Sequence, residues 1–184
     1  RVTAPEDHAA VSCISQDPRA GKSNIWYYGS GEVSGNSASK SFSAYYRGSG
    51  IYKSTDDGDT WTLLEETAAL IHKASDWDAV FRVLVDPVRA DSDIVMAAMS
   101  EGIMRSNDGG DTWNTTLFAN DAGFTDIQVT TSGTYYAAIS SDGGSNRGFW
   151  RSTDGLNWTN ITPAGFPNTH GRTLMAIYPG DQTK

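Results

Sequence analysis

The chain has little cysteine, no long apolar run and no cluster of basic residues. Its single cysteine, Cys13, excludes an internal disulfide and a cysteine-based zinc site. The longest uncharged apolar run, residues 94–99, is far shorter than the roughly 20 residues that a membrane span needs. The 14 Lys and Arg are outnumbered by 22 Asp and Glu, which gives a net charge of −8 and argues against a nucleic-acid partner. The three histidines share no metal-ligand spacing, so we expect neither a metal nor a cofactor.

Three segments of the chain repeat one order of residue types. Each has Gly, two large apolar residues, a basic residue and Ser, followed by Asp, Gly and Trp. The serines are 52 and then 46 residues apart. The repeated residues are Ser54, Asp56, Gly58 and Trp61; Ser106, Asp108, Gly110 and Trp113; and Ser152, Asp154, Gly155 and Trp158. We expect the Asp to accept backbone hydrogen bonds in a tight turn, the Gly to take positive φ and the Trp to pack between neighbouring sheets.

Two strand-like runs precede each repeat, and the residues on either side of the repeated turn supply two more strands. The runs are residues 10–15 and 25–28, 80–85 and 94–99, and 126–130 and 135–139, with a last one at 173–178. Four short strands per unit at this period are typical of a β-propeller blade, so the sequence predicts an all-β, partial propeller of antiparallel blades.

The repeat period also predicts how the chain is divided. Residues 1–66 form a first blade with a long insert at 29–48, residues 67–118 a connection and second blade, and residues 119–162 a third blade; residues 163–184 form a connection and the truncated first strand of a fourth. Propellers typically close about 4–8 blades into a ring. We therefore expect a fragment of a six- to eight-bladed ring, and Arg1 in place of Met suggests that the natural start lies upstream.

The repeated segments resemble the Asp-box, or bacterial neuraminidase repeat, S-x-D-x-G-x-x-W, over nearly the whole chain. The third copy is one residue shorter between Asp154 and Trp158. This repeat is found in sialidases, xyloglucanase-type endoglucanases and sortilin-like receptors. The segments 29–32 and 46–48 are also similar to secreted or cell-surface proteins of Bacteroidetes, often type IX secretion cargo. The resemblance implies a propeller and an extracellular location, but hardly an activity, because the repeat lies in an outer turn away from the family's active sites.

Propeller topology predicts that ligands bind on the face opposite the repeated turns. On that face the insert offers Glu32, Asn36, Tyr45, Tyr46 and Arg47, which suit a polar ligand, although a Ser-rich surface loop with its tyrosines packed down is the simpler interpretation. The loop at 140–148 adds Arg147 on the same face.

A short acidic segment is the weak candidate for catalysis. Asp76 and Asp78 flank Trp77, which could place a general acid beside a sugar-stacking ring. Glycosidases need two carboxyl groups about 5–5.5 Å or about 6.5–9.5 Å apart, a distance that sequence does not give. In the alternative interpretation, Trp77 anchors the blade and both carboxylates are solvated.

The sialidase resemblance implies an arginine triad and a Phe/Tyr-Arg-Ile-Pro motif. Residues 81–84, Phe-Arg-Val-Leu, lack the Pro and lie in a predicted strand. Arg47, Arg147 and Arg172 could converge on the ligand face, yet each has a local structural explanation.

Three functions therefore stay open. The first is a non-catalytic recognition or scaffold segment of a larger secreted or cell-surface protein, with a glycan or protein ligand and the remaining blades as partners. The second is a glycoside hydrolase whose site is completed by blades outside this chain, and the third is a sortilin-like peptide-binding receptor.

Overall fold

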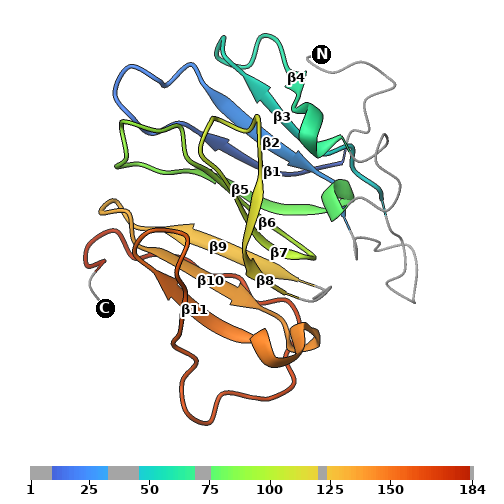
Figure 1. Ribbon diagram of the computed structural model, residues 1–184, viewed down its shortest axis with the longest axis vertical. Helices are drawn as coiled ribbons and strands as arrows, with labels where there is room; N and C mark the ends of the chain where they lie inside the picture. The colour runs from blue at the N-terminus through green and yellow to red at the C-terminus, as the bar shows by residue number, and fades with distance from the viewer. Residues whose placement is uncertain (1–9, 33–45, 69–75, 120–123, 183–184) are drawn as a thin grey trace.

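The computed structural model describes residues 10–32, 46–68, 76–119 and 124–182, which form three four-stranded antiparallel sheets (Figure 1). The first sheet, blade one, contains β1 Val11–Gln16, β2 Trp26–Ser30, β3 Ile51–Ser54 and β4 Thr62–Leu63. Blade two contains β5 Val80–Val85, β6 Val95–Met99, β7 Gly102–Ser106 and β8 Asn114–Phe118. Blade three contains β9 Thr125–Val129, β10 Tyr135–Ile139, β11 Gly148–Ser152 and β12 Thr159–Asn160. Three 3-10 helices occur in the connections: η1 Glu65–Thr67, η2 Asp76–Asp78 and η3 Ser141–Asn146.

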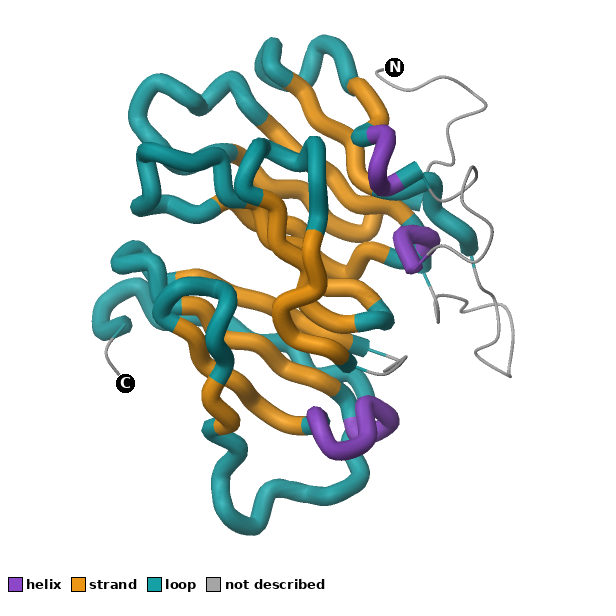
Figure 2. The backbone as a smooth tube through the Cα atoms, in the orientation of Figure 1, coloured by secondary structure: helices purple, strands orange, loops and turns teal. Residues whose placement is uncertain are grey.

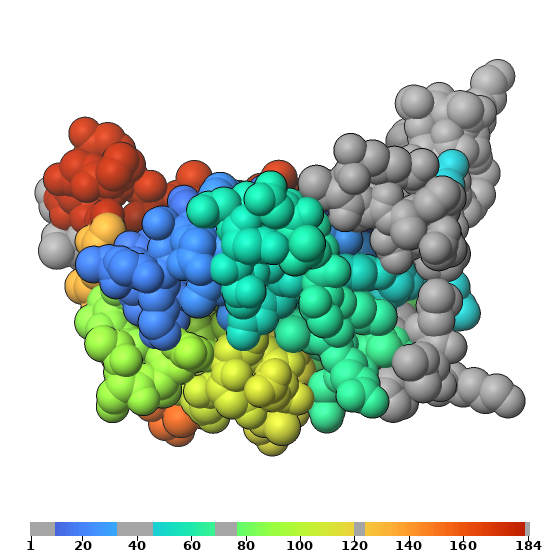
Figure 3. Space-filling view, turned by 90° about the horizontal axis from the view of Figure 1, so that it is seen from above, coloured from blue at the N-terminus to red at the C-terminus, as the bar shows by residue number. Residues whose placement is uncertain are grey.

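Each sheet is a simple meander in which every strand pairs with the next one along the chain. The first strands of successive blades, β1, β5 and β9, lie next to one another, so the sheets pack face to face as blades of a partial propeller (Figure 2). Blades one and two also lie directly against each other in the space-filling view of Figure 3. Along the described residues, no helix is long and apolar enough to cross a membrane.

The strand predictions agree with the structure to within a residue or two, with one exception. Residues 173–178 do not form a strand, although their pattern predicts one. A first strand pairs with the second strand of its own blade, and no such strand follows within the 184 residues. The segment instead follows blade three, where the amide of Met175 donates to Asp126 Oδ2 at 2.7 Å and Gln128 Nε2 donates to the carbonyl of Met175 at 2.9 Å.

The three repeated turns, residues 54–61, 106–113 and 152–158, have the predicted hydrogen bonds. In the second turn Ser106 Oγ donates to Asp108 Oδ1 at 2.6 Å, and Asp108 accepts from the amide of Thr112 at 2.9 Å. Gly110 has φ of 105°, as the turn requires. The shorter third turn keeps this arrangement because Asn157 takes the place of the threonine. Its backbone amide donates to Asp154 Oδ1 and its side-chain Nδ2 donates to Asp154 Oδ2, both at 2.8 Å.

Two apolar clusters fill the spaces between blades. One joins blades one and two and includes Trp113, and the other joins blades two and three, with Trp158 packed against it. The expected position of the tryptophans between sheets is therefore confirmed for these two. Trp61 packs on Tyr28 at 4.7 Å between ring centroids, on the face of blade one turned away from blade two.

Carboxylate–arginine pairs also join the blades. After β1, the buried Asp17 holds Arg19 at 2.6 Å, and this arginine reaches Asp93 of blade two at 2.8 Å. After β5, the buried Asp86 holds Arg89, whose Nη2 donates to a backbone carbonyl of the third repeated turn at 2.6 Å. Both carboxylates belong to an Asp-Pro pair followed within two residues by Arg, a second repeated signature that can be found in the sequence.

Candidate functional site

The antiparallel topology divides the loops between two ends of the blades. The repeated turns lie at the same end as the turns after β1 and β5, since the amide of Asp57 donates to the carbonyl of Asn24 at 3.0 Å and that of Gly109 to the carbonyl of Asp93 at 2.8 Å. The other end carries η2, η3 and the connections between blades, toward the right edge of Figure 1. We call this end the insert face, because the insert at 29–48 leaves blade one there.

The insert is closed at its base by backbone pairing. Glu32 and Tyr46 exchange two backbone hydrogen bonds of 2.8 Å each, and the amide of Gly48 donates to the carbonyl of Asp78 at 2.7 Å. Arg47 Nε lies 3.5 Å from Asp78 Oδ2, so the structure brings the insert together with η2. Tyr46 is 57% exposed on this face. Asn36 and Tyr45 lie outside the described residues.

A second ion pair joins the insert to the far end of the chain. Glu32 Oε2 lies 3.9 Å from Arg172 Nη1. The guanidinium of Arg172 also lies over the ring of Phe124, 5.3 Å from its centroid. Glu32 and Arg172 are 140 positions apart, and the folding of three blades brings them together.

The segment around Trp77 has a structural position. The Trp77 side chain is only 8% exposed and packs in the core between blades one and two, 5.1 Å from the ring of Trp113. Asp78 is partly buried beside Arg47. Asp76 begins η2, but its side chain lies outside the described part. The ring of Trp77 thus has the anchoring position of the alternative interpretation and presents no open surface to a sugar.

The arginine of the Phe-Arg-Val-Leu string has a partner in the neighbouring blade. Arg82 Nε lies 2.5 Å from Oδ1 of Asp126, a carboxylate with 1% exposure, and so joins β5 to β9. Arg47 and Arg172 of the suggested triad form the ion pairs above, whereas Arg147 has no carboxylate partner among the described residues.

Arg147 lines a polar recess on the outer part of blade three, which we call the blade-three recess. Its volume is about 300 Å³. The residues that line it come from the loop before β11 and the first residue of that strand, and from the end of β12 and the chain after it: Ser145, Arg147, Gly148, Asn160, Thr162, Phe166, Pro167, Asn168 and His170. The sequence indicates only Arg147 of this set as a binding candidate, because none of the others except Gly148 belongs to the repeated pattern.

The residues after β12 are held in place around the recess. Phe166 packs edge-on against both Phe149 and His170, with centroids 4.9 Å apart in each case. The two ring nitrogens of His170 lie 3.2 Å from the carbonyl of Pro167 and 3.0 Å from that of Ile139. The connection is therefore attached to the end of β10, and the recess has fixed walls.

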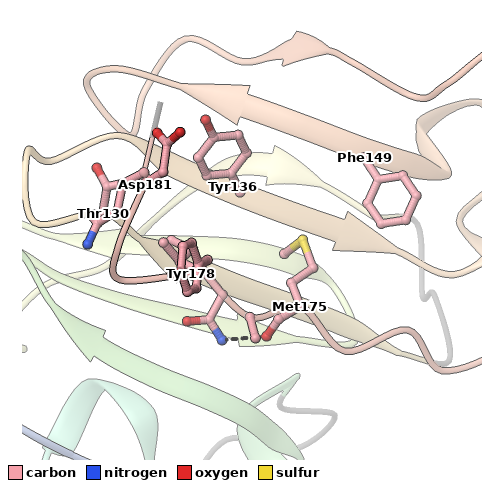
Figure 4. A pocket seen from close by; sticks show the side chains of 10 residues that line it. Thr130, Tyr136, Phe149, Met175, Tyr178 and Asp181 are labelled. Carbon is pink, nitrogen blue, oxygen red and sulfur yellow. Dashed lines mark hydrogen bonds between the residues drawn. The ribbon is translucent and has the colours of Figure 1, made fainter. Parts of the chain in front are cut away.

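A second cavity, of about 350 Å³, lies between blade three and the segment that follows it (Figure 4). Tyr136 and Phe149 form one side, and Met175 and Tyr178 the other. These strand residues face away from blade two, so the cavity lies on the outer face of the last blade. Within the described ranges, no three His, Cys, Asp or Glu residues come together as a metal site would need.

Comparison with solved structures identifies propellers with similar blades. An ancestral GH74 enzyme aligns over 94% of this chain and 22% of its own length, with 19% identity and a TM-score of 0.64. The GH74 enzyme of Niastella koreensis aligns over 86% of this chain and 31% of its own, with 20% identity and a TM-score of 0.50. The chain is a partial β-propeller of four-stranded antiparallel blades.

These similarities concern the fold. The chain spans about a fifth to a third of the length of the solved structures that it resembles. Comparison of the sequence with protein-family models and with curated proteins gave no match.

Proposed function

We propose that the chain is a non-catalytic recognition or scaffold segment of a larger secreted or cell-surface propeller of the Asp-box type. Its ligand, a glycan or a protein, binds on the insert face. The proposal rests on the surroundings of two acidic side chains and a tryptophan on this face. Glu32 and Asp78 each face an arginine, and Trp77 is buried. In a glycosidase the two carboxyl groups face the scissile bond instead.

Further support comes from the form of the insert face. It carries the exposed Tyr46 and, in blade three, a polar recess at Arg147 that is also lined by Phe166. Polar side chains beside an aromatic surface are typical of sites that hold sugars or peptides. Two neighbours with TM-scores of at least 0.5 are described as GH74 enzymes, which favours a carbohydrate ligand over other small molecules. The remaining blades of a six- to eight-bladed ring are the proposed partners, and an extracellular location follows from the resemblance of the insert to secreted proteins.

The test combines binding and hydrolysis. The 184-residue chain is titrated calorimetrically with xyloglucan, other β-glucan and sialylated oligosaccharides, and the same mixtures are assayed for released reducing ends. We expect binding without release. Release that is abolished by Asp78→Ala, but kept by Asp111→Ala in an exposed repeated turn at the opposite end, would overturn the non-catalytic assignment.

A glycoside hydrolase completed by further blades is the second candidate. The observation that favours it is the position of Asp78, whose side chain is 18% exposed at the edge of the insert face. This candidate predicts that the full-length protein hydrolyses xyloglucan or another β-glucan, and that Asp78→Asn abolishes the activity while binding persists. A full-length protein that binds these polymers and releases nothing would eliminate it.

A further inference from the structure

We propose that the blade-three recess binds an anionic sugar, one that carries a carboxylate or a sulfate ester beside its hydroxyl groups. This inference rests on the proposed recognition function and specifies the ligand class for one site on the insert face. It follows from the charge of the recess, from the hydrogen-bonding groups that its side chains leave available, and from its aromatic wall.

The charge of the recess is opposite to that of the chain. The protein carries a net charge of −8, yet the residues that line the recess include an arginine and a histidine and no aspartate or glutamate. The carboxylate of the same loop, Asp142, accepts a hydrogen bond from Ser140 Oγ and does not line the recess. An arginine in a concave, polar environment without a carboxylate partner attracts an anion.

The guanidinium of Arg147 is held in place by two hydrogen bonds and still has N–H donors that a ligand can use. Nη1 donates to the carbonyl of Gly144 at 3.1 Å, and Nη2 donates to Asn168 Oδ1 at 3.3 Å. A guanidinium has five N–H donors, so these two bonds fix its plane and leave three for a ligand. The planar fork matches the two oxygens of a carboxylate or a sulfate.

The two asparagines of the recess also leave donors available. The amide of Thr162 donates to Asn160 Oδ1 at 3.0 Å, and Arg147 donates to Asn168 Oδ1. These bonds assign the oxygen of each side-chain amide, so both NH2 groups are left without a partner among the described residues. The recess therefore offers mainly donors, which fits a ligand rich in acceptor oxygens.

The remaining wall is apolar and rigid. Phe166 presents an aromatic ring that is held by Phe149 and His170, so it can pack against the carbon face of a sugar. Thr162 Oγ1 accepts from the amide of Phe149 at 2.9 Å, and a Cβ at Gly148 would meet that oxygen at 2.1 Å. The base of the recess is thus closely packed, and its form does not depend on a ligand. A volume of about 300 Å³ lies at the lower end of the range for small-molecule sites, about 300–1,000 Å³, and suits one or two sugar units.

The test uses three oligosaccharide probes with the 184-residue chain. Trigalacturonate supplies carboxylates, a sulfated galactan trisaccharide supplies sulfate esters, and cellotriose supplies hydroxyl groups alone. We expect at least one anionic probe to bind more tightly than cellotriose, and its affinity to fall as NaCl is raised from 50 to 500 mM. The anionic probe that binds identifies the source of the charge.

Substitutions assign the binding to the recess. Arg147→Gln should weaken binding of the anionic probe about 10- to 100-fold, the loss expected for a charge-assisted hydrogen bond, and Arg147→Lys should recover part of it. The matched control is Arg151→Gln, an exposed arginine near the other end of the same strand and outside the recess. Asn168→Ala should also weaken binding, because it removes both a donor and the group that orients Arg147.

Three results would overturn the inference: equal affinity for neutral and anionic probes, equal losses from Arg147→Gln and Arg151→Gln, or no binding of any probe. Binding of neutral glycans that is insensitive to Arg147→Gln would leave the proposed recognition function in place. Hydrolysis of a bound anionic probe would instead overturn the non-catalytic function and leave the recess assigned.

Discussion

A hydrogen bond from Tyr135 of blade three to Asp86 of blade two can be tested by removing the tyrosine hydroxyl group. Tyr135 is fully buried, and its hydroxyl donates to Asp86 Oδ2, a carboxylate with no exposed surface. The same carboxylate accepts from the amides of Val88 and Arg89, each at 2.8 Å. Tyr135→Phe keeps the ring and the packing but leaves the buried charge with one donor fewer.

The expected loss can be estimated from the kind of bond removed. A hydrogen bond to a charged group contributes about 1.5–3 kcal/mol to the free energy of unfolding. For a chain of this size each kcal/mol lowers Tm by about 2–4 °C, so Tyr135→Phe should lower Tm by about 3–12 °C. Tyr136→Phe is the control, because its half-buried ring faces the outer side of blade three, away from Asp86.

The loss should also depend on pH. Burial opposes the ionisation of Asp86, but the hydrogen bonds from Tyr135 and the amides of Arg89 and Val88, together with the charge of Arg89, lower the pKa of this carboxyl below its ordinary 3.8. A lowered pKa stabilises the folded state above about pH 4, and this contribution is lost as the pH falls through the folded pKa. The difference in free energy between the parent chain and Tyr135→Phe, measured by urea denaturation, should therefore shrink on acidification from pH 7 to pH 3.

Two results would refute this reasoning. One is a loss for Tyr135→Phe no larger than that for Tyr136→Phe at pH 7. The other is a difference in unfolding free energy that stays constant between pH 7 and pH 3, since the hydrogen bond stabilises the ionised form of Asp86.

Three further predictions concern single residues. Gly110→Ala should lower the free energy of unfolding by about 1–3 kcal/mol, because its Cβ would meet Leu64 Cδ1 at 2.4 Å and φ is 105°; a denaturation curve like that of the parent chain would contradict it. Burial opposes the ionisation of Asp108, yet hydrogen bonds within its turn lower its pKa to about 2, so an NMR titration should give that value in the parent chain and a higher one in Thr112→Val. The hydrogen bond from Thr112 Oγ1 to Asp108 should add to the free energy of unfolding above about pH 4, and this contribution should disappear as the pH falls toward 2. Cys13 is partly buried against the core between blades one and two, and this burial raises the pKa of its thiol. A thiol reagent should therefore react slowly with the folded chain at pH 7 and quickly in urea, and equal rates would show that the fold does not protect the thiol.

Much of the blade architecture could be predicted because its signals are local. The Ser-Asp-Gly-Trp turns are stabilised by hydrogen bonds between residues two to four positions apart, such as Ser106 with Asp108 and Asp108 with Thr112. The strand runs are rich in β-branched and aromatic residues and end at turn residues, so their positions follow from the chain itself. Residues 173–178 show the limit of this reasoning, because a strand-like pattern forms a sheet only where a neighbouring strand provides backbone partners.

The candidate site could be predicted only in part. The sequence placed the loops of Arg47 and Arg147 at one end of the blades, and the structure has them there, because strand count and antiparallel order fix the end at which each loop lies. It did not indicate that Asp78 would face Arg47, and it left open whether Trp77 anchors the blade or offers its ring to a sugar, which the packing of that ring against Trp113 decides.

The repeat, the turns and the sorting of loops between two faces follow from the order of residues along the chain. Which charges meet, and where a recess opens, depends on the packing of the folded blades. Glu32 meets Arg172 across 140 positions, and the blade-three recess joins the loop that leads into β11 with the chain that leaves β12. Such contacts depend on how three sheets pack and how an unrepeated connection folds back on its blade, and neither is encoded in the spacing of neighbouring residues.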